Sequence, residues 1–256
     1  MNRTRRLLRR LFYAASRPRN GAAWVLACSI LSGCGWTPPG KPDPRNRPLA
    51  PTEVLDFTTL YQKNCSGCHG AEGKLGVAPP LNDPLFLAII PKDELGKVID
   101  SGRLGTMMPA FARANGGHLT PEQVRVLAEG IVSTWGKKEG EGPDVSKVPS
   151  YLAPGSTTQG SAEAGAAVFA RACANCHGEQ GKGGERAGAL NVPAFLALSS
   201  DQFLRRIVIT GRPDLGMPGF ERKKLGGNEK SLTDQEIADV VAYLASWRRP
   251  VTAMGP

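Results

Sequence analysis

A five-residue motif, Cys-x-x-Cys-His, occurs twice in the chain and constrains its folding more than any other feature. The first copy spans residues 65–69 and the second spans 173–177, 108 residues later. A Met-Pro pair follows each copy at nearly the same distance, with Met108 and Met217 standing 39 and 40 residues after the histidine of their copy. Cys-x-x-Cys alone also occurs in zinc sites and redox dithiols. The repetition with a matching methionine favours a different chemistry.

Cys-x-x-Cys-His is the attachment signature of c-type haem. Two thiols three residues apart can add to the two vinyl groups of one haem, and the adjacent histidine then reaches the iron from the proximal side. The sequence therefore predicts two covalently bound haems c. The predicted attachment and proximal residues are Cys65, Cys68, His69, Cys173, Cys176 and His177.

The remaining cysteines argue against other cysteine chemistry. The chain has six, and the two outside the motifs, Cys28 and Cys34, lie near the N-terminus. None is left for a disulfide, a zinc site or a catalytic thiol in the body of the protein.

The N-terminal segment predicts export from the cytoplasm. Residues 1–33 contain seven arginines and no acidic residue, and an apolar run extends from Gly21 to Leu31. Because a membrane-spanning helix needs roughly 20 apolar residues, we interpret residues 1–33 as a secretory signal peptide. Its end, Leu31-Ser-Gly-Cys34, resembles the lipobox of bacterial lipoproteins, in which the cysteine is acylated. We expect a lipid at Cys34 and a position on the periplasmic side of the membrane; the alternative is an ordinary signal peptide or an uncleaved helical anchor.

The excess of positive charge belongs to this signal. The full chain carries +9, of which residues 1–33 contribute +7, so residues 34–256 carry only +2. Four haem propionates would bring the mature protein to a neutral or slightly negative charge. The high isoelectric point therefore gives no support to nucleic-acid binding.

A proline-rich segment follows the signal. Residues 34–51 include six prolines among mostly polar residues. Such a composition stays extended, so we predict a tether that can hold the folded body up to about 50 Å from a lipid anchor. A disordered leader is the alternative.

The body of the chain is an internal duplication. Residues 81–88 align with 190–197, and no gap is needed from there to the two Met-Pro-x-Phe stretches. Each half predicts an entry helix before its motif, a middle helix, and an exit helix that begins at a threonine cap and ends at a tryptophan. The predicted helices span residues 52–64, 92–101 and 120–135 in the first half and 161–172, 200–210 and 233–247 in the second.

These elements predict an all-α chain of two domains. We place the domains at residues 52–136 and 159–249, with a linker rich in Gly, Pro and Ser at 137–158 and a tail at 250–256. Each domain is small for a single hydrophobic core, and a buried porphyrin would supply the missing apolar mass.

Over about residues 50–248 both halves resemble class I cytochrome c domains, and the pair resembles the periplasmic diheme cytochromes c. The resemblance implies two tandem domains, each a small helical fold around one covalent haem c. In the second domain, Gly165 and Phe169 match the small and aromatic residues of the family's entry helix. The first domain departs, with Phe57 at the small position and Gly130 on its exit helix. We expect the small residue to have moved to the partner helix; a wider crossing is the alternative.

The resemblance also implies a backbone carbonyl that accepts a hydrogen bond from the Nδ1–H of each ligand histidine. The family has a proline at this place, and Pro79 supplies it in the first domain. Gly188 stands there in the second domain, in a loop one residue longer. Because this bond sets the basicity of the ligand, we predict different reduction potentials for the two haems.

Few residues remain for the distal side of each iron. The matched Met-Pro-x-Phe stretches select Met108 and Met217 as the axial ligands. Met107 is then expected to pack or to face solvent, with a switch between the two adjacent methionines as the alternative. His118 is expected on the surface, before the cap of the exit helix.

Arg103 and Arg212 recur just before the two methionine loops. We expect them either to pair with haem propionates or to be solvated charges at helix ends. Both roles stay open at the level of sequence.

Histidine–methionine ligation predicts a function in electron transfer. The soft thioether favours ferrous iron and closes the second axial position, so the site reorganises little between redox states. We therefore expect an electron carrier rather than an enzyme, passing single electrons between a donor and an acceptor redox protein outside the cytoplasmic membrane. It would act as a free tethered carrier or as a cytochrome subunit of a membrane respiratory complex. The alternative is a diheme enzyme such as a peroxidase, which needs one haem with an open site.

Overall fold

Both copies of the motif lie in one compact unit of the chain, residues 49–256. The computed structural model describes residues 40, 42–138, 140–152, 159–221 and 230–249. The predictions for the signal peptide at 1–33, for lipidation at Cys34 and for the tail at 250–256 lie outside the described residues.

The regular structure of the described residues is helical. They contain no strand, and extended pairing is limited to two isolated bridges, Ala112 with Leu119 and Arg212 with Met217. The predicted all-α fold is confirmed. No helix in this part of the chain has the length and apolar character needed to cross a membrane.

The first half forms its α-helices where the sequence provides caps. In residues 49–138 they are α3 (Phe57–Asn64), α4 (Ser66–His69), α5 (Pro84–Ile89), α6 (Glu94–Ser101) and α7 (Pro121–Trp135). Asp56 and Asp83 accept hydrogen bonds from backbone N–H groups at the starts of α3 and α5. Thr120 and Gln123 form a capping box at the start of α7. The entry helix thus begins at Phe57, later than predicted, because Asp56 caps it there.

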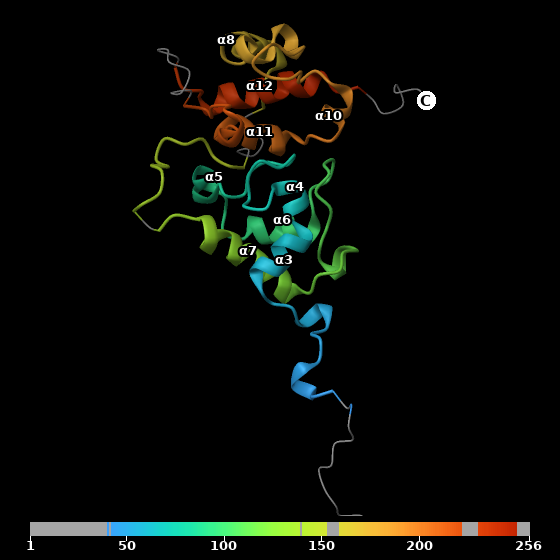
Figure 1. Ribbon diagram of the computed structural model, residues 1–256. Helices are drawn as coiled ribbons and strands as arrows, with labels where there is room; N and C mark the ends of the chain where they lie inside the picture. The colour runs from blue at the N-terminus through green and yellow to red at the C-terminus, as the bar shows by residue number, and fades with distance from the viewer. Residues whose placement is uncertain (1–39, 41, 139, 153–158, 222–229, 250–256) are drawn as a thin grey trace, which may run out of the picture. The chain divides into compact units, whose positions relative to one another are not determined.

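The second half repeats this order. Its α-helices in the described residues are α8 (Ala162–Ala172), α9 (Ala174–His177), α10 (Pro193–Ala197), α11 (Asp201–Thr210) and α12 (Asp234–Ser246). Thr233 and Glu236 form the predicted capping box of the exit helix. In Figure 1, α8 and α11 both pack against α12. The predicted entry, middle and exit helices of this half are confirmed.

Short 3-10 turns connect some of these helices. They are η2 (Pro44–Asn46), η3 (Pro51–Glu53), η4 (Arg113–Asn115), η5 (Glu179–Gly181) and η6 (Pro213–Leu215). Two short α-helices, α5 and α10, lie between the motif and the middle helix of each half, where the sequence predicts no helix. Both begin with a proline in the first turn, Pro84 and Pro193, which is a recognised helix-start signal.

Entry and exit helices cross differently in the two halves. In the second half Gly165 lies against the backbone of α12, since a Cβ there would be 2.0 Å from the carbonyl oxygen of Asp239. In the first half the glycine is on the exit helix, and a Cβ on Gly130 would be 2.1 Å from the ring of Phe57. The expected move of the small residue to the partner helix is confirmed, and an aromatic ring fills the space at that crossing.

An aromatic pair joins the entry and exit helices of each half. The rings of Tyr61 and Trp135 have centroids 5.0 Å apart, and those of Phe169 and Trp247 are 5.3 Å apart. Both pairs meet edge to face, an arrangement that stabilises beyond the area it buries. The pairs hold the exit helix beside the helical turn that carries the motif.

The end of the predicted linker is part of the core. Tyr151 is only 3% exposed and packs near Phe86 of α5. Its backbone carbonyl accepts a hydrogen bond from Gln202 of α11, and the carbonyl of Ser150 accepts one from Arg205. Residues 150–151 therefore contact both halves, so this end of the predicted linker at 137–158 is packed against them.

The end of the predicted tether is also held in place. The side-chain amide of Gln123 on α7 donates to the carbonyl oxygens of Pro51 and Val54, at 2.7 and 3.0 Å. The chain is thus fixed to the first half from Pro51 onward.

Candidate functional site

Each Cys-x-x-Cys-His motif forms a short helical turn directly after the entry helix. The backbone N–H of His69 donates to the carbonyl of Cys65, and that of His177 donates to Cys173, at 2.9 and 3.0 Å. Residues four apart on a helix share a face, so the first cysteine and the histidine of each motif point to the same side. The fold thereby brings together the residues that the sequence predicts to hold one haem.

The first histidine is enclosed and fixed. His69 is 8% exposed, and its Nδ1 lies 2.8 Å from the carbonyl oxygen of Pro79. A carbonyl only accepts, so Nδ1 carries the proton and Nε2 keeps its lone pair for a metal. The pKa of His69 is lowered to about 4, chiefly by burial; the hydrogen bond to Pro79 opposes this shift, and the charges of Arg206 and Arg212 add to it. The imidazole is therefore neutral at physiological pH, which is the metal-binding form.

A cavity of about 430 Å³ lies beside His69. The predicted ligands Cys65, Cys68 and Met108 line it together with His69. Most of the other lining residues from the first half are apolar, among them Leu81, Phe86, Ile90, Leu95, Val98, Ile99, Phe111 and Ile131. An apolar cavity of this size is within the range of cofactor sites, and its donors are two thiols, an imidazole and a thioether. The residues present fit haem c.

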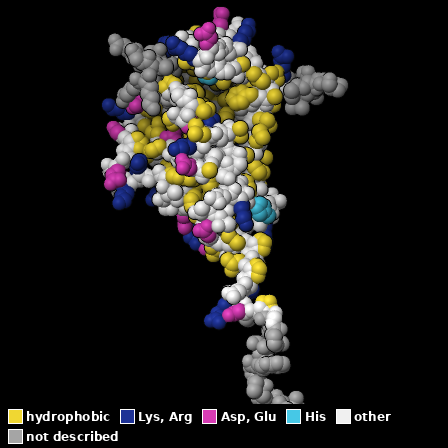
Figure 2. Space-filling model, in the orientation of Figure 1, with side chains coloured by type: hydrophobic (Ala, Val, Ile, Leu, Met, Phe, Trp, Pro, Cys, Tyr) yellow, Lys and Arg dark blue, Asp and Glu magenta, His cyan; other side chains and the backbone are white. Residues whose placement is uncertain are grey.

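The methionine loop is held by its own backbone. The N–H of Arg103 donates to the carbonyl of Met108, and the N–H of Met108 donates to the hydroxyl of Thr106. Met107 and Val77 also line the cavity, but both are largely exposed to solvent, Met107 at 70% and Val77 at 82%. The cavity thus opens to solvent at an apolar rim, and hydrophobic side chains are exposed over much of the face in Figure 2.

The second motif has more open surroundings. None of the residues of α9 is buried, in contrast to His69 in α4. The Nδ1 of His177 lies 3.1 Å from the carbonyl oxygen of Gly188, so the predicted acceptor is a glycine in a loop without the proline. Met217 is in a loop that is closed by two backbone hydrogen bonds with Arg212, both 3.0 Å long. The same donor types are present here, in a less enclosed setting.

Comparison with known proteins finds a matching family for each half of the chain. Residues 162–248 match the Cytochrome c family, and residues 52–129 match the family described as Cytochrome C oxidase, cbb3-type, subunit III. The two matches cover the two motifs separately. The chain is a diheme c-type cytochrome. Each of its two cytochrome c domains binds one haem c covalently.

The relatives of this diheme cytochrome include subunits of one enzyme type. It is 34% identical over 135 residues to the cbb3-type cytochrome c oxidase subunit CcoP of Rubrivivax gelatinosus, covering 52% of this chain and 36% of the relative. It is 33% identical over 157 residues to the subunit FixP of Azorhizobium caulinodans, covering 58% and 46%. The chain therefore spans about a third to a half of the length of these relatives.

A solved structure shares the fold only loosely. A chain from a reducing HAO-like protein complex of Kuenenia stuttgartiensis aligns with a TM-score of 0.40 and 18% identity, covering 75% of this chain and 96% of that one. This likeness is too low to carry an argument about function.

The second domain of the diheme cytochrome supplies a wall of the first haem cavity. The residues that reach the cavity from α10, α11 and the loop between them are Ala194, Phe195, Leu198, Ser199, Gln202, Phe203 and Arg206. Sequence reasoning missed this wall, because it depends on how the two domains pack. One signal was present in the sequence, because Arg205 and Arg206 are adjacent arginines in a helix that is otherwise amphipathic. The structure shows that both side chains are buried.

The two recurring arginines are not solvated helix-end charges. The side chain of Arg103 is 20% exposed, lines the first cavity and donates to the hydroxyl of Tyr151 at 2.6 Å. The side chain of Arg212 is 13% exposed and forms two hydrogen bonds with Asp214. It also donates to the carbonyl oxygen of Gly76 in the first domain, at 3.0 Å. Pairing with propionates stays a prediction for both.

The ion pair of Arg212 and Asp214 joins the domains. The Arg212 guanidinium lowers the pKa of Asp214, whose side chain is 5% exposed. Asp214 accepts a hydrogen bond from the backbone N–H of Leu75, a non-glycine residue with a φ of 62°. The loop after the first motif is thus held by the loop that carries Met217.

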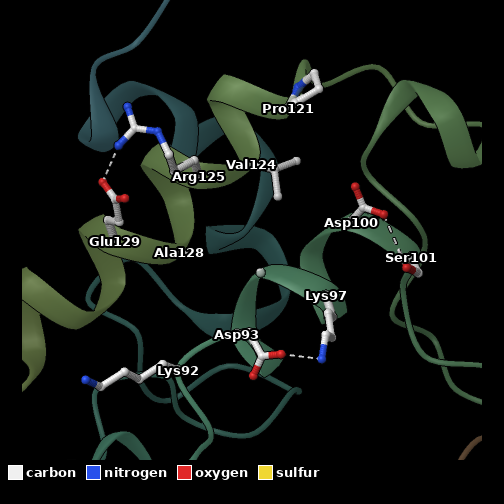
Figure 3. A pocket seen from close by; sticks show the side chains of 11 residues that line it. Lys92, Asp93, Lys97, Asp100, Ser101, Pro121, Val124, Arg125, Ala128 and Glu129 are labelled. Carbon is white, nitrogen blue, oxygen red and sulfur yellow. Dashed lines mark hydrogen bonds and ion pairs between the residues drawn. The ribbon is translucent and has the colours of Figure 1, made fainter.

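Two further features are not part of the haem cavity lining. His118 is exposed, with Nε2 2.8 Å from the amide oxygen of Asn64, in agreement with the predicted surface position. A second cavity of about 440 Å³ between α6 and α7 is lined largely by charged side chains (Figure 3). Asp93 with Lys97 and Arg125 with Glu129 form ion pairs there, so these charges are already satisfied.

Proposed function

We propose that this diheme cytochrome transfers single electrons between redox partners. Haem c supplies one reversible one-electron couple in each domain. The observation that carries the proposal is that both domains place a methionine loop of matching sequence after a Cys-x-x-Cys-His turn, so each domain offers one methionine for the distal side of its haem. An iron with both axial positions closed suits electron transfer and disfavours peroxide binding.

Specific residues would hold the two haems. In the first domain, proposed as residues 52–136, Cys65 and Cys68 would form the thioether links, and His69 and Met108 would be the axial ligands. The hydrogen bond from His69 to Pro79 fixes the imidazole ring, and the mostly apolar lining would contact the faces of the porphyrin.

The second domain, proposed as residues 159–249, would use the equivalent set. Cys173 and Cys176 would form the thioether links, and His177 and Met217 would be the axial ligands. Gly188 would orient His177 through its carbonyl oxygen, at 3.1 Å.

The partner and the location are part of the proposal. The relatives named above are subunits of cbb3-type cytochrome c oxidases, which supports a role beside or within a membrane respiratory complex. A lipid on Cys34 and a tether over residues 34–51 would keep the protein at the periplasmic side of the membrane. Whether it acts as a free tethered carrier or as a fixed subunit is decided by its partners. Purification from detergent extract with large subunits would indicate a fixed subunit, whereas recovery alone would indicate a carrier.

The absorption spectrum of the purified ferric protein tests the function. With haem counted, we expect two low-spin haems, a methionine–iron charge-transfer band, and no change when hydrogen peroxide is added. One high-spin haem that reacts with peroxide would contradict the carrier and favour a diheme peroxidase.

A further inference from the structure

Arg206 is a second-domain residue placed at the first haem site. It lies on α11, is 8% exposed, and lines the cavity that contains Cys65, His69 and Met108. Its guanidinium carbon stands 3.5 Å from the centroid of the Phe86 ring, a cation–π contact across the domain boundary. Arg103 of the first domain lines the same cavity, so Arg206 is a second cation there, contributed by the other domain.

Arg206 also holds the loop that orients the proximal histidine. One guanidinium nitrogen donates to the carbonyl oxygen of Pro80. The neighbouring carbonyl, that of Pro79, accepts the hydrogen bond from Nδ1 of His69. Arg206 is therefore two contacts away from the ligand, through adjacent carbonyls of one rigid Pro-Pro segment.

Arg206 has no ion-pair partner among the described residues, and the buried Asp83 carboxylate interacts with it only at longer range. Among the described residues, no carboxylate lies within ion-pairing distance of it, and its Nε is buried without a hydrogen-bond partner. The charged and titratable groups that interact with it electrostatically are Asp83, Arg103, Tyr151, Arg212 and His69. A buried, unpaired charged donor costs free energy, which points to a group that the donor serves when the cavity is filled.

The corresponding position in the first domain is different. The duplication aligns Arg206 of α11 with Lys97 of α6, which is 65% exposed in its side chain and paired with Asp93. At this repeat position the first domain therefore has an exposed lysine. The second domain has an arginine that is buried against the haem cavity of the first domain.

We propose that Arg206 is a positioning residue for the first haem, through which the second domain raises that haem's reduction potential. A fixed, poorly screened positive charge disfavours the additional positive charge of ferric iron. The bond to Pro80 keeps the Pro79 carbonyl, and with it His69, in place. The first haem reaches its full potential only with the second domain docked. The inference requires haem c in the first domain and is independent of which redox partners are used.

Redox titration of the two-haem protein followed by its spectrum tests the proposal. Arg206→Gln removes the charge, and Arg206→Lys keeps it while losing the flat contact with Phe86. Arg171→Gln is the matched control, since it removes a charge from the same domain whose side chain is 41% exposed and paired with Glu236. Met217→His should shift the midpoint potential of the second haem only, which shows which of the two waves in the redox titration belongs to which haem.

We expect Arg206→Gln to lower the reduction potential of the first haem, so that its ferric-to-ferrous ratio at a fixed potential rises at least tenfold. For a one-electron couple, a tenfold change in this ratio corresponds to 59 mV. The second haem should change less than twofold, and Arg171→Gln should change neither haem by more than twofold. Arg206→Lys should keep the first haem within threefold of the natural protein. If Arg206→Gln does not assemble, Arg206→Met removes the same charge while filling the space beside Phe86.

Three results would overturn the inference. One is an Arg206→Gln or Arg206→Met protein whose first haem is unchanged. Another is a shift of both haems by the same factor, which would indicate a general loss of packing. The third is an Arg206→Lys protein that shifts as far as the neutral variants, since the charge would then be irrelevant.

Discussion

The two haem domains have the same order of helices but differ in what surrounds the ligand histidine. His69 is buried, fixed by Pro79 and walled on one side by the second domain. His177 is only partly buried and faces a glycine carbonyl in a loop without the proline. The duplication thus preserved the residues that would bind iron, while packing between the domains added a wall of second-domain side chains to the first cavity. Burial, nearby charge and hydrogen bonding are the means by which a protein tunes a haem.

The helix crossings differ in a parallel way. The second domain brings two backbones together at Gly165, whereas the first places the ring of Phe57 against Gly130. Close packing is achieved in both, so the requirement is for a small residue at the crossing and not for a particular helix to carry it.

Replacement of the proposed axial methionines should give the largest effect. Met108→His and Met217→His each exchange a soft thioether for imidazole, which stabilises ferric iron. We expect the potential of one haem to fall by a sizeable part of the roughly 0.8 V that axial ligands span. Redox titration of each variant measures this. Met107→Leu is the control and should move neither haem; a large shift with Met107→Leu would show that the adjacent methionines exchange roles.

Removal of the Tyr151 side chain should destabilise the fold strongly. Tyr151→Ala empties a buried site beside Phe86, which costs about 3–5 kcal/mol for an aromatic residue. Tyr151→Phe keeps the ring and loses only the hydrogen bond from Arg103, at a cost of about 1.5–3 kcal/mol. Denaturant unfolding measures both. Equal stability of Tyr151→Ala and the natural protein would mean that residues 150–151 act as a free linker.

The glycine crossings predict a rescue in one domain only. Gly130→Ala and Gly165→Ala should each destabilise by about 1–3 kcal/mol through overpacking. Phe57→Ala should relieve Gly130→Ala, since the blocking atoms belong to that ring. Gly165→Ala meets the Asp239 carbonyl, so truncating Tyr243 or another nearby side chain should not restore it. Thermal unfolding of single and double variants checks this, and an unrescued Gly130→Ala would indicate a different crossing.

The smallest expected effect is at the second proximal loop. A Cβ on Gly188 would meet no atom within 4 Å. Gly188→Ala should therefore stabilise the protein by about 0.4–1 kcal/mol, because it restricts the unfolded chain. A less mobile carbonyl should also bring the potential of the second haem closer to that of the first. A loss of stability in thermal unfolding would mean that this loop requires glycine.

Much of this comparison could be predicted from the sequence, because local signals carry it. The motifs, the matched methionines and the threonine caps predict the helices and the candidate ligands, and the Pro79–Gly188 difference is visible in the aligned loops. The burial of Tyr151 could not be found in this way, nor could the wall that Arg206 and other second-domain residues supply to the first haem cavity. Both depend on contacts between residues far apart in the chain, and a Gly- and Pro-rich segment or an arginine pair does not by itself name its partner. The short helices α5 and α10 were missed for lack of length, although their prolines mark the starts.

The most direct test of the account is a redox titration of the purified two-haem protein, with Met108→His used to assign the waves. An enclosed apolar site with a buried cation favours ferrous iron more than an open one. We therefore predict two one-electron waves separated by more than about 60 mV, a tenfold difference in equilibrium constant, with the first haem at the higher potential. Two haems with equal midpoints, or a second haem above the first, would contradict the claim that packing between the domains tunes one site.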